Sequence, residues 1–358
     1  MQKQKSIKIE NFRCFQDIKI SGFKNVNLIG GKNNAGKTSL LEALLVYFYP
    51  HPSSIVGLKR IRKESSDTIK RQPKDAWNNF FYNQDIENNI SIYGRFDDEE
   101  KKVSLSISQS LQSKILEDNE DVKKLLDFIS DSNSSISILQ IQQHLNDEKI
   151  FQRNLIAHSR GILSPDFPDE IDIPFIPSSH RISNEEIAKK YDKIDFEGNG
   201  EDVLQMIQML DNSIENIRTY SHIEPTLYLQ KKNQKRGFPI SLFGDAVYRV
   251  AEITLEILNE DHNVIFIDEI ENGIHYTSQK KFWEALFRLS NDLQTMIFAT
   301  THSLEMIKSF MEAGQNFPNQ GAYIELAHNP RTDQIIAITR DTDILEYEIE
   351  HGKPIRGE

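Results

Sequence analysis

Short hydrophobic runs and longer helical patterns alternate along much of the chain. Alternating or continuous apolar residues predict strands at residues 6–10, 18–20, 26–29, 90–96, 103–107, 264–267, 296–299, 323–326 and 335–338. Apolar residues that recur every three or four positions predict helices at residues 38–48, 246–258 and 280–289. After residue 227 the predicted strands and helices alternate, which indicates a buried and largely parallel sheet.

The middle of the chain has a less regular pattern, and we expect residues 109–220 to be mainly helical. The clearest helix is predicted for residues 201–220, where apolar residues repeat at three and four positions: Leu204, Ile207, Leu210, Ile214 and Ile217. No heptad pattern is sustained, so a long coiled coil is excluded.

The composition narrows the class of protein. The 358 residues include 42 Lys and Arg against 54 Asp and Glu, and this net charge of −12 argues against a nucleic-acid coat protein without excluding a local basic patch. Cys14 is the single cysteine, which excludes an internal disulfide and a cysteine-based zinc site and fits a reducing, cytoplasmic location. The apolar runs fall short of the ~20 residues that a membrane span needs, so no membrane contact is expected.

The strongest chemical signal is Gly31-Lys32-Asn33-Asn34-Ala35-Gly36-Lys37-Thr38, which matches G-x-x-x-x-G-K-[ST] between a predicted strand and a predicted helix. Backbone N–H groups in such a loop surround phosphate oxygens, and the helix N-terminus favours the negative charge. We expect Lys37 to pair with the β- and γ-phosphates of ATP and the Thr38 hydroxyl to bind Mg²⁺. The predicted ATP-binding residues are Gly31, Asn33, Asn34, Ala35, Gly36, Lys37, Thr38 and Ser39.

A second signal is the apolar run at residues 264–267, which ends in Asp268-Glu269. Acidic residues at a strand end are often solvated caps, but in a chain with a P-loop they are expected to take part in nucleotide hydrolysis. We expect Asp268 to hold Mg²⁺ through water and Glu269 to orient or deprotonate the attacking water. His302 ends the next apolar run, where it can reach the γ-phosphate or merely cap a surface turn.

A weaker signal lies between residues 239 and 245, where Ser241 and Gly244 precede a predicted helix. Gly244 can expose that helix N-terminus to a phosphate, although a single glycine before a helix is usually a cap.

These four elements, in this order, resemble the nucleotide-binding head of ABC-type ATPases, in the branch of SMC, RecF and OLD proteins. The opening Ile9-Glu10-Asn11-Phe12-Arg13-Cys14-Phe15 resembles the N-terminal strand of that branch, residues 241–245 resemble a degenerate signature motif, and residues 268–275 resemble its Walker B motif and D-loop. The resemblance implies an α/β P-loop ABC-ATPase head with a two-lobed sheet and a short, mainly helical inserted arm. The head would comprise residues 1–108 and 225–358, with residues 109–224 as the insertion.

The resemblance also implies roles for individual residues. Arg13 would touch the nucleotide or form a surface salt bridge, and Gln84 is a candidate for the Q-loop. Ser241 and Gly244 would contact the ATP of a second subunit, although Asp245 would repel its γ-phosphate unless its side chain points away. Each site would thus be shared between two chains of a homo-oligomer.

Residues 303–307 and 347–357 further resemble short-armed ATPases of bacterial phage-defence operons, including PARIS-like, Septu-like and OLD-type systems. This implies an ATP-driven switch that controls a separate effector, expected to be a nuclease, because too few residues follow His302 for the Toprim domain of OLD nucleases. The alternatives are a RecF-like repair ATPase that clamps duplex DNA and a scaffold that binds ATP without turnover. The basic segment Lys59–Lys74 would contact DNA or an acidic partner, or would be a solvated loop.

Overall fold

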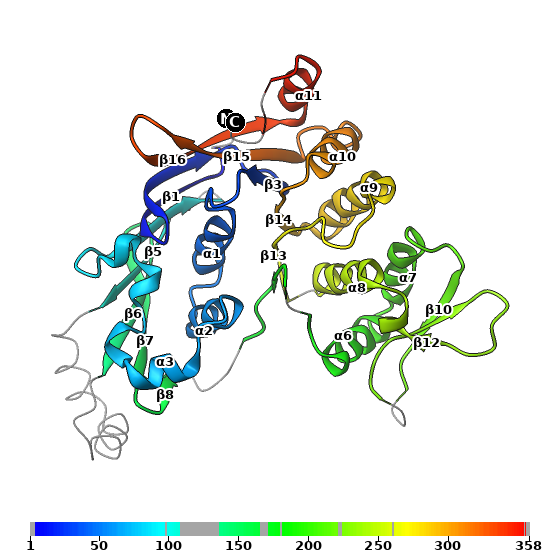
Figure 1. Cartoon of the computed structure of the whole chain (residues 1–358), viewed down its shortest axis with the longest axis horizontal. Coiled ribbons are helices and arrows are strands. Elements are labelled where there is room, and N and C mark those ends of the chain that lie inside the picture. Colours follow the sequence, from blue (N-terminus) through cyan, green and yellow to red (C-terminus); the bar gives the residue numbers. More distant parts are fainter. Residues whose placement is uncertain are drawn as a thin grey trace. The chain divides into compact units, whose positions relative to one another are not determined.

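The computed structural model in Figure 1 describes residues 4–96, 99–107, 136–164, 171–179, 181–220, 224–259, 261–353 and 355. The chain forms two compact units. Unit 1 comprises residues 1–22, 38–173 and 328–337, and unit 2 comprises residues 23–37, 174–327 and 338–358. Each unit combines segments that are distant in the sequence.

Unit 1 is built on an antiparallel sheet of seven strands in the order β2-β1-β4-β5-β6-β7-β8. The strands are β1 (Ser6–Phe12), β2 (Phe15–Ser21), β4 (Ile90–Arg95), β5 (Lys101–Ile107), β6 (Ser137–Leu145), β7 (Glu148–His158) and β8 (Gly161–Leu163). Alternating isoleucines bury one face of the sheet, whereas the residues between them are polar and at least partly exposed. The unit also contains the helices α1 (Lys37–Phe48), α2 (Pro52–Ile61) and α3 (Ser66–Arg71). The first residue of α1, Lys37, is assigned to unit 2. The predicted hairpin is confirmed as β4 and β5.

Unit 2 contains the parallel sheet that the second half of the sequence predicts. Its strand order is β16-β15-β3-β14-β13-β9, and the pairs from β15 to β9 are parallel. The strands are β3 (Val26–Gly31), β9 (Phe175–Ile176), β13 (Val264–Ile267), β14 (Met296–Thr300), β15 (Gly321–Asn329) and β16 (Gln334–Asp341), and the last two cross the division between the units. A buried core joins this sheet to α8 (Asp245–Leu258), α9 (Tyr276–Leu293) and α10 (Leu304–Gly314); α11 (Thr342–Glu350) follows β16.

A smaller group of elements in unit 2 packs on α8 around its own apolar core. It consists of α6 (Asn184–Phe196), α7 (Gly200–Gln208) and a three-stranded sheet of β10 (Ile214–Arg218), β11 (Tyr228–Lys231) and β12 (Phe238–Pro239). The prediction of one helix over residues 201–220 is therefore wrong beyond Gln208. The Asp211 carboxylate accepts hydrogen bonds from the backbone N–H and the hydroxyl of Ser213, which stabilises a turn, and Ile214 and Ile217 then point into the core from a strand.

The expectation of a mainly helical arm at residues 109–224 is also wrong for the part that the structure describes. That part contains β6 to β10 and only two α-helices, while residues 108–135 lie outside the described ranges. Strands β6 and β7 meet at Asn146-Asp147, and both residues have positive φ, as a tight two-residue hairpin requires. In the sequence, this Asn-Asp pair between two alternating segments indicates a β-hairpin, and the prediction of a mainly helical arm does not take it into account. Among the described residues, no helix is long and apolar enough to cross a membrane.

Candidate active site

The P-loop has the strand–turn–helix arrangement that the sequence predicts. Strand β3 ends at Gly31, residues 32–36 form the turn, and α1 begins at Lys37. Gly31 has a φ of +138°, and a Cβ there would lie 2.3 Å from the Leu326 carbonyl oxygen, so the position requires glycine. The Ala35 N–H donates to the Lys32 carbonyl oxygen at 3.2 Å. The loop is therefore a compact turn at the carboxyl end of a buried strand.

Lys37 lies folded into this turn. Its side chain is 5% exposed, and Nζ donates to the carbonyl oxygens of Gly31 and Lys32, each at 2.8 Å. Burial lowers the pKa of Lys37 to about 8, although the carboxylates of Asp268, Glu271 and Glu269 raise it in the opposite direction. An anionic phosphate would restore the preference for the charged amine.

Strand β13 carries the first carboxylate of the site at its end. Asp268 is 6% exposed, and its Oδ1 accepts a hydrogen bond from Thr300 Oγ1 at 2.6 Å. The same hydroxyl oxygen accepts from the Glu269 backbone N–H at 2.8 Å. Thr300 thus fixes the ends of the neighbouring strands β13 and β14 together. A nearly buried carboxylate is a hard oxygen donor of the kind that Mg²⁺ prefers, so the donor chemistry fits this ion.

The second carboxylate, Glu269, faces the predicted histidine. Glu269 Oε1 lies 3.5 Å from His302 Nε2, and its Oε2 accepts from Asn272 Nδ2 at 3.0 Å. Glu271 Oε1 in turn accepts from the His302 backbone N–H at 2.6 Å. Strands β3, β14 and β13 are consecutive neighbours in the sheet (Figure 1), and their ends bring Lys37, Asp268, Glu269 and His302 to one edge.

The signature-like segment also forms a helix N-terminus. Ser241 lies in the short helix η4 (Ile240–Leu242), and Gly244 caps α8 with a φ of +87°. A Cβ at Gly244 would meet no atom within 4 Å, so the glycine serves the backbone conformation rather than close packing. The Asp245 carboxylate pairs with the Arg181 guanidinium, which compensates the negative charge expected to repel a phosphate.

Arg249 is a residue of this region that the sequence analysis did not identify. It is 7% exposed, and it donates to the backbone carbonyls of Pro177 at 2.8 Å and Asp268 at 2.7 Å. It also pairs with the buried Glu252 at 3.5 Å. A pocket of about 400 Å³ adjoins these side chains; its lining includes Ser178, Arg181, Asp245, Arg249, Asn272 and Gly273. The position of Arg249, one helical turn after Asp245 in α8, is the signal that could have identified it.

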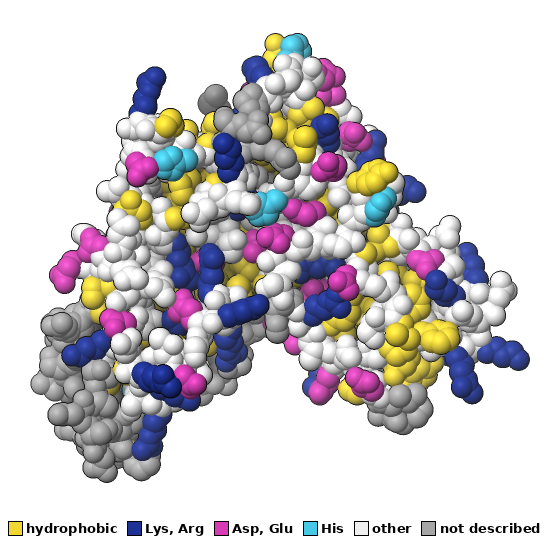
Figure 2. Space-filling view, viewed as in Figure 1, with side chains coloured by type: hydrophobic (Ala, Val, Ile, Leu, Met, Phe, Trp, Pro, Cys, Tyr) yellow, Lys and Arg dark blue, Asp and Glu magenta, His cyan; other side chains and the backbone are white. Residues whose placement is uncertain are grey.

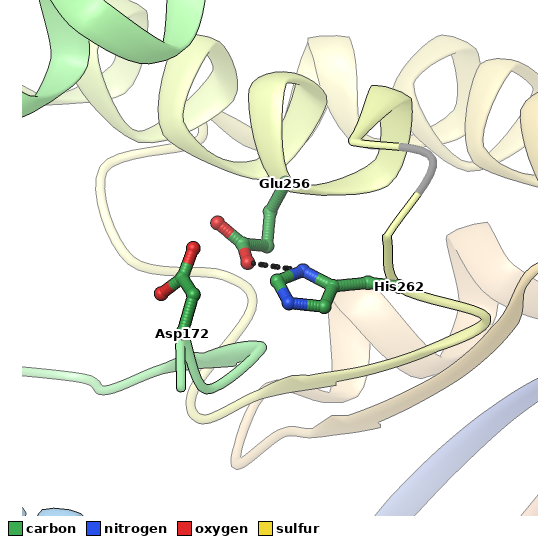
Figure 3. A group of neighbouring side chains, drawn as sticks. All are labelled: Asp172, Glu256 and His262. Carbon is green, nitrogen blue, oxygen red and sulfur yellow. Dashed lines mark ion pairs between the residues drawn. The ribbon is translucent and has the colours of Figure 1, made fainter. Parts of the chain in front are cut away.

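The far end of α8 is fixed by a separate buried network. Glu256 Oε1 lies 3.0 Å from His262 Nδ1 (Figure 3), and Lys190 Nζ donates to Glu256 Oε2 at 2.6 Å. The third residue drawn in Figure 3, Asp172, belongs to unit 1, and we assign no metal site across the two units. Helix α8 is therefore held at the signature end by Arg249 and at the other end by Glu256.

In unit 1 Arg13 forms a largely buried salt bridge with Glu42, with 10% of the Arg13 side chain and none of the Glu42 side chain exposed, so the expected surface salt bridge is wrong in its location. Its Nε donates to Glu42 at 2.8 Å, its Nη1 donates to the Asn79 carbonyl at 2.8 Å, and its guanidinium lies over the Phe80 ring at 4.4 Å. Gln84 is exposed and donates to Asn79 Oδ1 at 3.3 Å. A role in nucleotide contact remains a prediction for both residues.

The basic segment Lys59–Lys74 forms parts of α2 and α3 rather than an extended solvated loop. Lys59 is 4% exposed and pairs with Glu64, and Arg62 donates to Glu42. The basic segment therefore presents fewer unpaired positive charges to a ligand than its sequence suggests. Its exposed basic residues are Arg60, Arg62, Lys63, Lys70, Arg71 and Lys74.

Comparison with known proteins places this chain in a family. Residues 3–307 match the AAA ATPase domain family. An ATP/GTP phosphatase of Helicobacter pylori is 28% identical over 331 residues, which cover 85% of this chain and 86% of that protein. The Rad50 ATPase of Archaeoglobus fulgidus, a DNA double-strand break repair protein, is 42% identical over 66 residues, which cover 18% of this chain but 7% of that protein.

The fold is likewise similar to a solved structure. The crystal structure of an SMC head bound to the C-winged helix domain of ScpA superposes with a TM-score of 0.51 at 10% identity, covering 96% of this chain and 99% of that one. Because the identity is low, this similarity concerns the fold alone. The chain belongs to the AAA ATPase domain family and has the fold of an ABC-type ATPase head, similar to that of the SMC head.

Proposed function

We propose that the chain hydrolyses ATP with Mg²⁺ at the edge of the parallel sheet. The observation that carries this proposal is the convergence of Lys37, Asp268, Glu269 and His302 on the ends of three neighbouring strands. The match to an ATPase family and the similarity to an ATP/GTP phosphatase support the same activity. Phosphate release from purified protein, with ATP and GTP compared and with EDTA added, tests both the activity and its metal requirement.

Each residue has a distinct role in this proposal. The N–H groups of the P-loop and Lys37 bind the phosphates, and Thr38 and Asp268 hold Mg²⁺, which neutralises phosphate charge when bound. Glu269 accepts a proton from the attacking water, and His302, 3.5 Å from Glu269, orients it and contacts the γ-phosphate. Asn272 donates to the other oxygen of Glu269 and limits its rotation.

We further propose that a second copy of the chain completes each site with its signature segment. Leu242 in this segment is 70% exposed, and Tyr276, which lies outside the segment just after the D-loop, is 64% exposed. Figure 2 shows hydrophobic side chains gathered over the part of unit 2 that contains the small sheet. Exposed apolar groups around a helix N-terminus are suited to an interface that forms around a bound phosphate.

A mixed-subunit experiment tests this sharing. Lys37→Ala and Gly244→Asp proteins should each be inactive, because aspartate is strained at a φ of +87° and adds negative charge opposite a phosphate. In mixed dimers one site receives both lesions and the other receives neither. Activity should recover to about a quarter of wild type with random exchange, or less if the sites are cooperative. Full activity of Gly244→Asp alone would refute the signature assignment.

The proposed biological role is an ATP-driven switch that controls a separate effector, a nuclease, in antiphage defence. The resemblance to short-armed defence ATPases supports it, and so does the solved SMC head, which is bound to another protein. The prediction is that Glu269→Gln with ATP forms a larger assembly than wild type with ADP, and that the product of a neighbouring nuclease gene co-purifies with one form. An identical size distribution in both states would contradict the switch.

A second candidate function is a DNA-repair ATPase that clamps duplex DNA. The local 42% identity to the Rad50 ATPase favours it. Duplex DNA should then stimulate ATP hydrolysis, and Mg-ATP should slow the dissociation of DNA; neither effect is expected of a switch that only holds a protein effector.

A further inference from the structure

The seven-stranded sheet in unit 1 carries an ordered row of six residues, four of which are lysines. Strand register places six residues side by side across six consecutive strands, each paired with the next. The row consists of Lys19, Lys8, Tyr93, Lys102, His144 and Lys149, and we call it the lysine row. Because paired residues of antiparallel strands point to the same face, the side chains from Lys19 to His144 stand on one side of the sheet, where they line one pocket; Lys149 continues the row after a register shift between Gln143 and His144.

The opposite face shows why the row is exposed. Ile9 pairs with both Ile18 and Ile92, and Ile92 pairs with Val103, so the neighbouring positions form a buried apolar row. Alternation then turns the lysines outward. Strands lie about 4.8 Å apart, so six strands give the lysine row a length of about 24 Å.

The same face is hollowed. A pocket of about 520 Å³ is lined by five members of the lysine row, all but Lys149. Its lining adds two more cations, Arg95 and Lys101, and contains two carboxylates, Glu100 and Asp147. The pocket is therefore cationic, in a chain whose net charge is −12.

Part of this charge is already paired. Lys8 pairs with Glu10 and with Asp17, the latter at 3.3 Å, and Arg95 pairs with Glu100. Lys102 Nζ lies 4.9 Å from the centre of the Tyr93 ring, which holds it at the middle of the row without neutralising it. His144 Nδ1 is buried and has no hydrogen-bond partner among the described residues. The middle and ends of the row thus keep positive charge that an anionic ligand can neutralise.

We propose that the lysine row binds the phosphodiester backbone of a nucleic acid. A row about 24 Å long that contains four lysines spans about seven phosphates at the 3.4 Å rise of one DNA strand. Lysine is a suitable point charge for such contacts, and a polar sheet face with a central aromatic residue is a surface on which a strand can lie. An acidic protein would require matched spacing of its carboxylates, whereas a nucleic acid carries evenly spaced charges on any sequence. The inference does not depend on ATP hydrolysis.

The experiment compares two sets of substitutions that remove equal charge. Lys19→Gln, Lys102→Gln and Lys149→Gln change the row, and Lys63→Gln, Lys70→Gln and Lys74→Gln change the exposed residues of the earlier candidate segment. Fluorescence anisotropy with a labelled single strand and a labelled duplex, at several salt concentrations, measures affinity and salt dependence. Thermal unfolding and basal ATPase activity confirm that both variants are folded.

Wild type should bind at least one probe, with an affinity that falls steeply as salt increases. The row variant should lose at least tenfold in affinity at low salt, and its salt slope should decrease by about three, since each neutralised phosphate contributes about 0.9. The matched variant should stay within about twofold of wild type. Preference for the single strand or the duplex identifies the natural form. Absence of binding at low salt, an equal loss in both variants, or a loss in the matched variant alone would overturn the proposal, and binding of a polyglutamate peptide but neither probe would assign the row to an acidic protein.

Discussion

The two large sheets place their polar residues differently. In the parallel sheet of unit 2, strands β3 and β13 are buried throughout, so the polar groups of the site follow the strand ends: Asp268 comes directly after β13, and Lys37 follows the turn after β3. In strands β1 and β2 of the antiparallel sheet of unit 1, apolar and polar residues alternate, so this part of the sheet has a polar face. A parallel sheet therefore concentrates chemistry at an edge, whereas an antiparallel sheet of this kind offers a surface.

This difference suggests a division of labour. The edge of the parallel sheet holds a few side chains in short contacts, which suits a chemical reaction. The polar face of the antiparallel sheet distributes the charges of the lysine row over about 24 Å, which suits the binding of a polymer. Substitutions at the edge should change turnover without changing nucleic-acid affinity in the absence of nucleotide, and substitutions in the lysine row should do the reverse.

The largest expected effect is that of Glu269→Gln. Glutamine keeps the shape and the hydrogen bond from Asn272 but cannot accept the proton, so turnover should fall by about 10²–10⁴-fold. ATP binding should be retained, because Glu269 is not among the residues proposed to bind the phosphates. Single-turnover hydrolysis and nucleotide-binding measurements check this. Loss of ATP binding together with turnover would instead assign Glu269 to the binding site.

A loss of about 10²–10³-fold in turnover is expected for Lys37→Ala, together with strongly weakened ATP binding. Lys37 donates to two loop carbonyls, so the variant should be compared by thermal unfolding with wild type to separate a collapsed loop from a lost phosphate contact. Nucleic-acid affinity of the nucleotide-free protein should remain at the wild-type value. A parallel loss of that affinity would contradict the separation between edge and face.

Arg249 connects the edge to the signature helix, and Arg249→Met should lower turnover by tens of fold. The substitution removes the donor to the Asp268 carbonyl and leaves Glu252 without its cation, which should also cost about 1–3 kcal/mol of folding free energy. Denaturant unfolding measures this change in the free energy of unfolding. The Arg249→Met, Glu252→Leu double variant is the control: it should recover stability but not turnover if Arg249 positions Asp268.

The parts of the molecule that could be predicted are those whose signal is local. The P-loop and Asp268-Glu269 are contiguous motifs beside apolar runs, so both their elements and their proximity follow from sequence. The signature glycine, Gly244, was likewise placed at a helix N-terminus. Their catalytic roles stay predictions until they are tested by substitution.

Other features depend on contacts that the sequence does not reveal. Apolar residues three positions apart fit a helix, yet Ile214 and Ile217 belong to a strand, because the turn at Asp211 and pairing with β11 override the helical pattern. The sequence presents Lys59 as part of a basic segment, although in the structure it is buried and paired with Glu64. The lysine row joins residues from Lys8 to Lys149, and only the register of six strands brings them together.

The smallest expected effect concerns pH and again separates edge from face. Burial lowers the pKa of Lys37 to about 8 in the nucleotide-free protein, and a bound phosphate should raise it again. ATP binding must therefore be accompanied by proton uptake once the pH exceeds this value. Between pH 7 and pH 9 the charged fraction of Lys37, and with it the apparent ATP affinity, should fall about tenfold.

Calorimetric titrations in two buffers of different ionisation enthalpy measure this uptake directly. About one proton should be taken up per ATP at pH 9 and little at pH 7, and Lys37→Ala should show no such difference. Nucleic-acid binding by the lysine row provides the contrast, because it does not use the buried amine of Lys37 and should therefore lack this proton uptake. An ATP affinity that stays constant up to pH 9 would show that Lys37 is charged before the nucleotide arrives, and the buried amine would then be stabilised by Asp268 and Glu271 more strongly than it is disfavoured by burial.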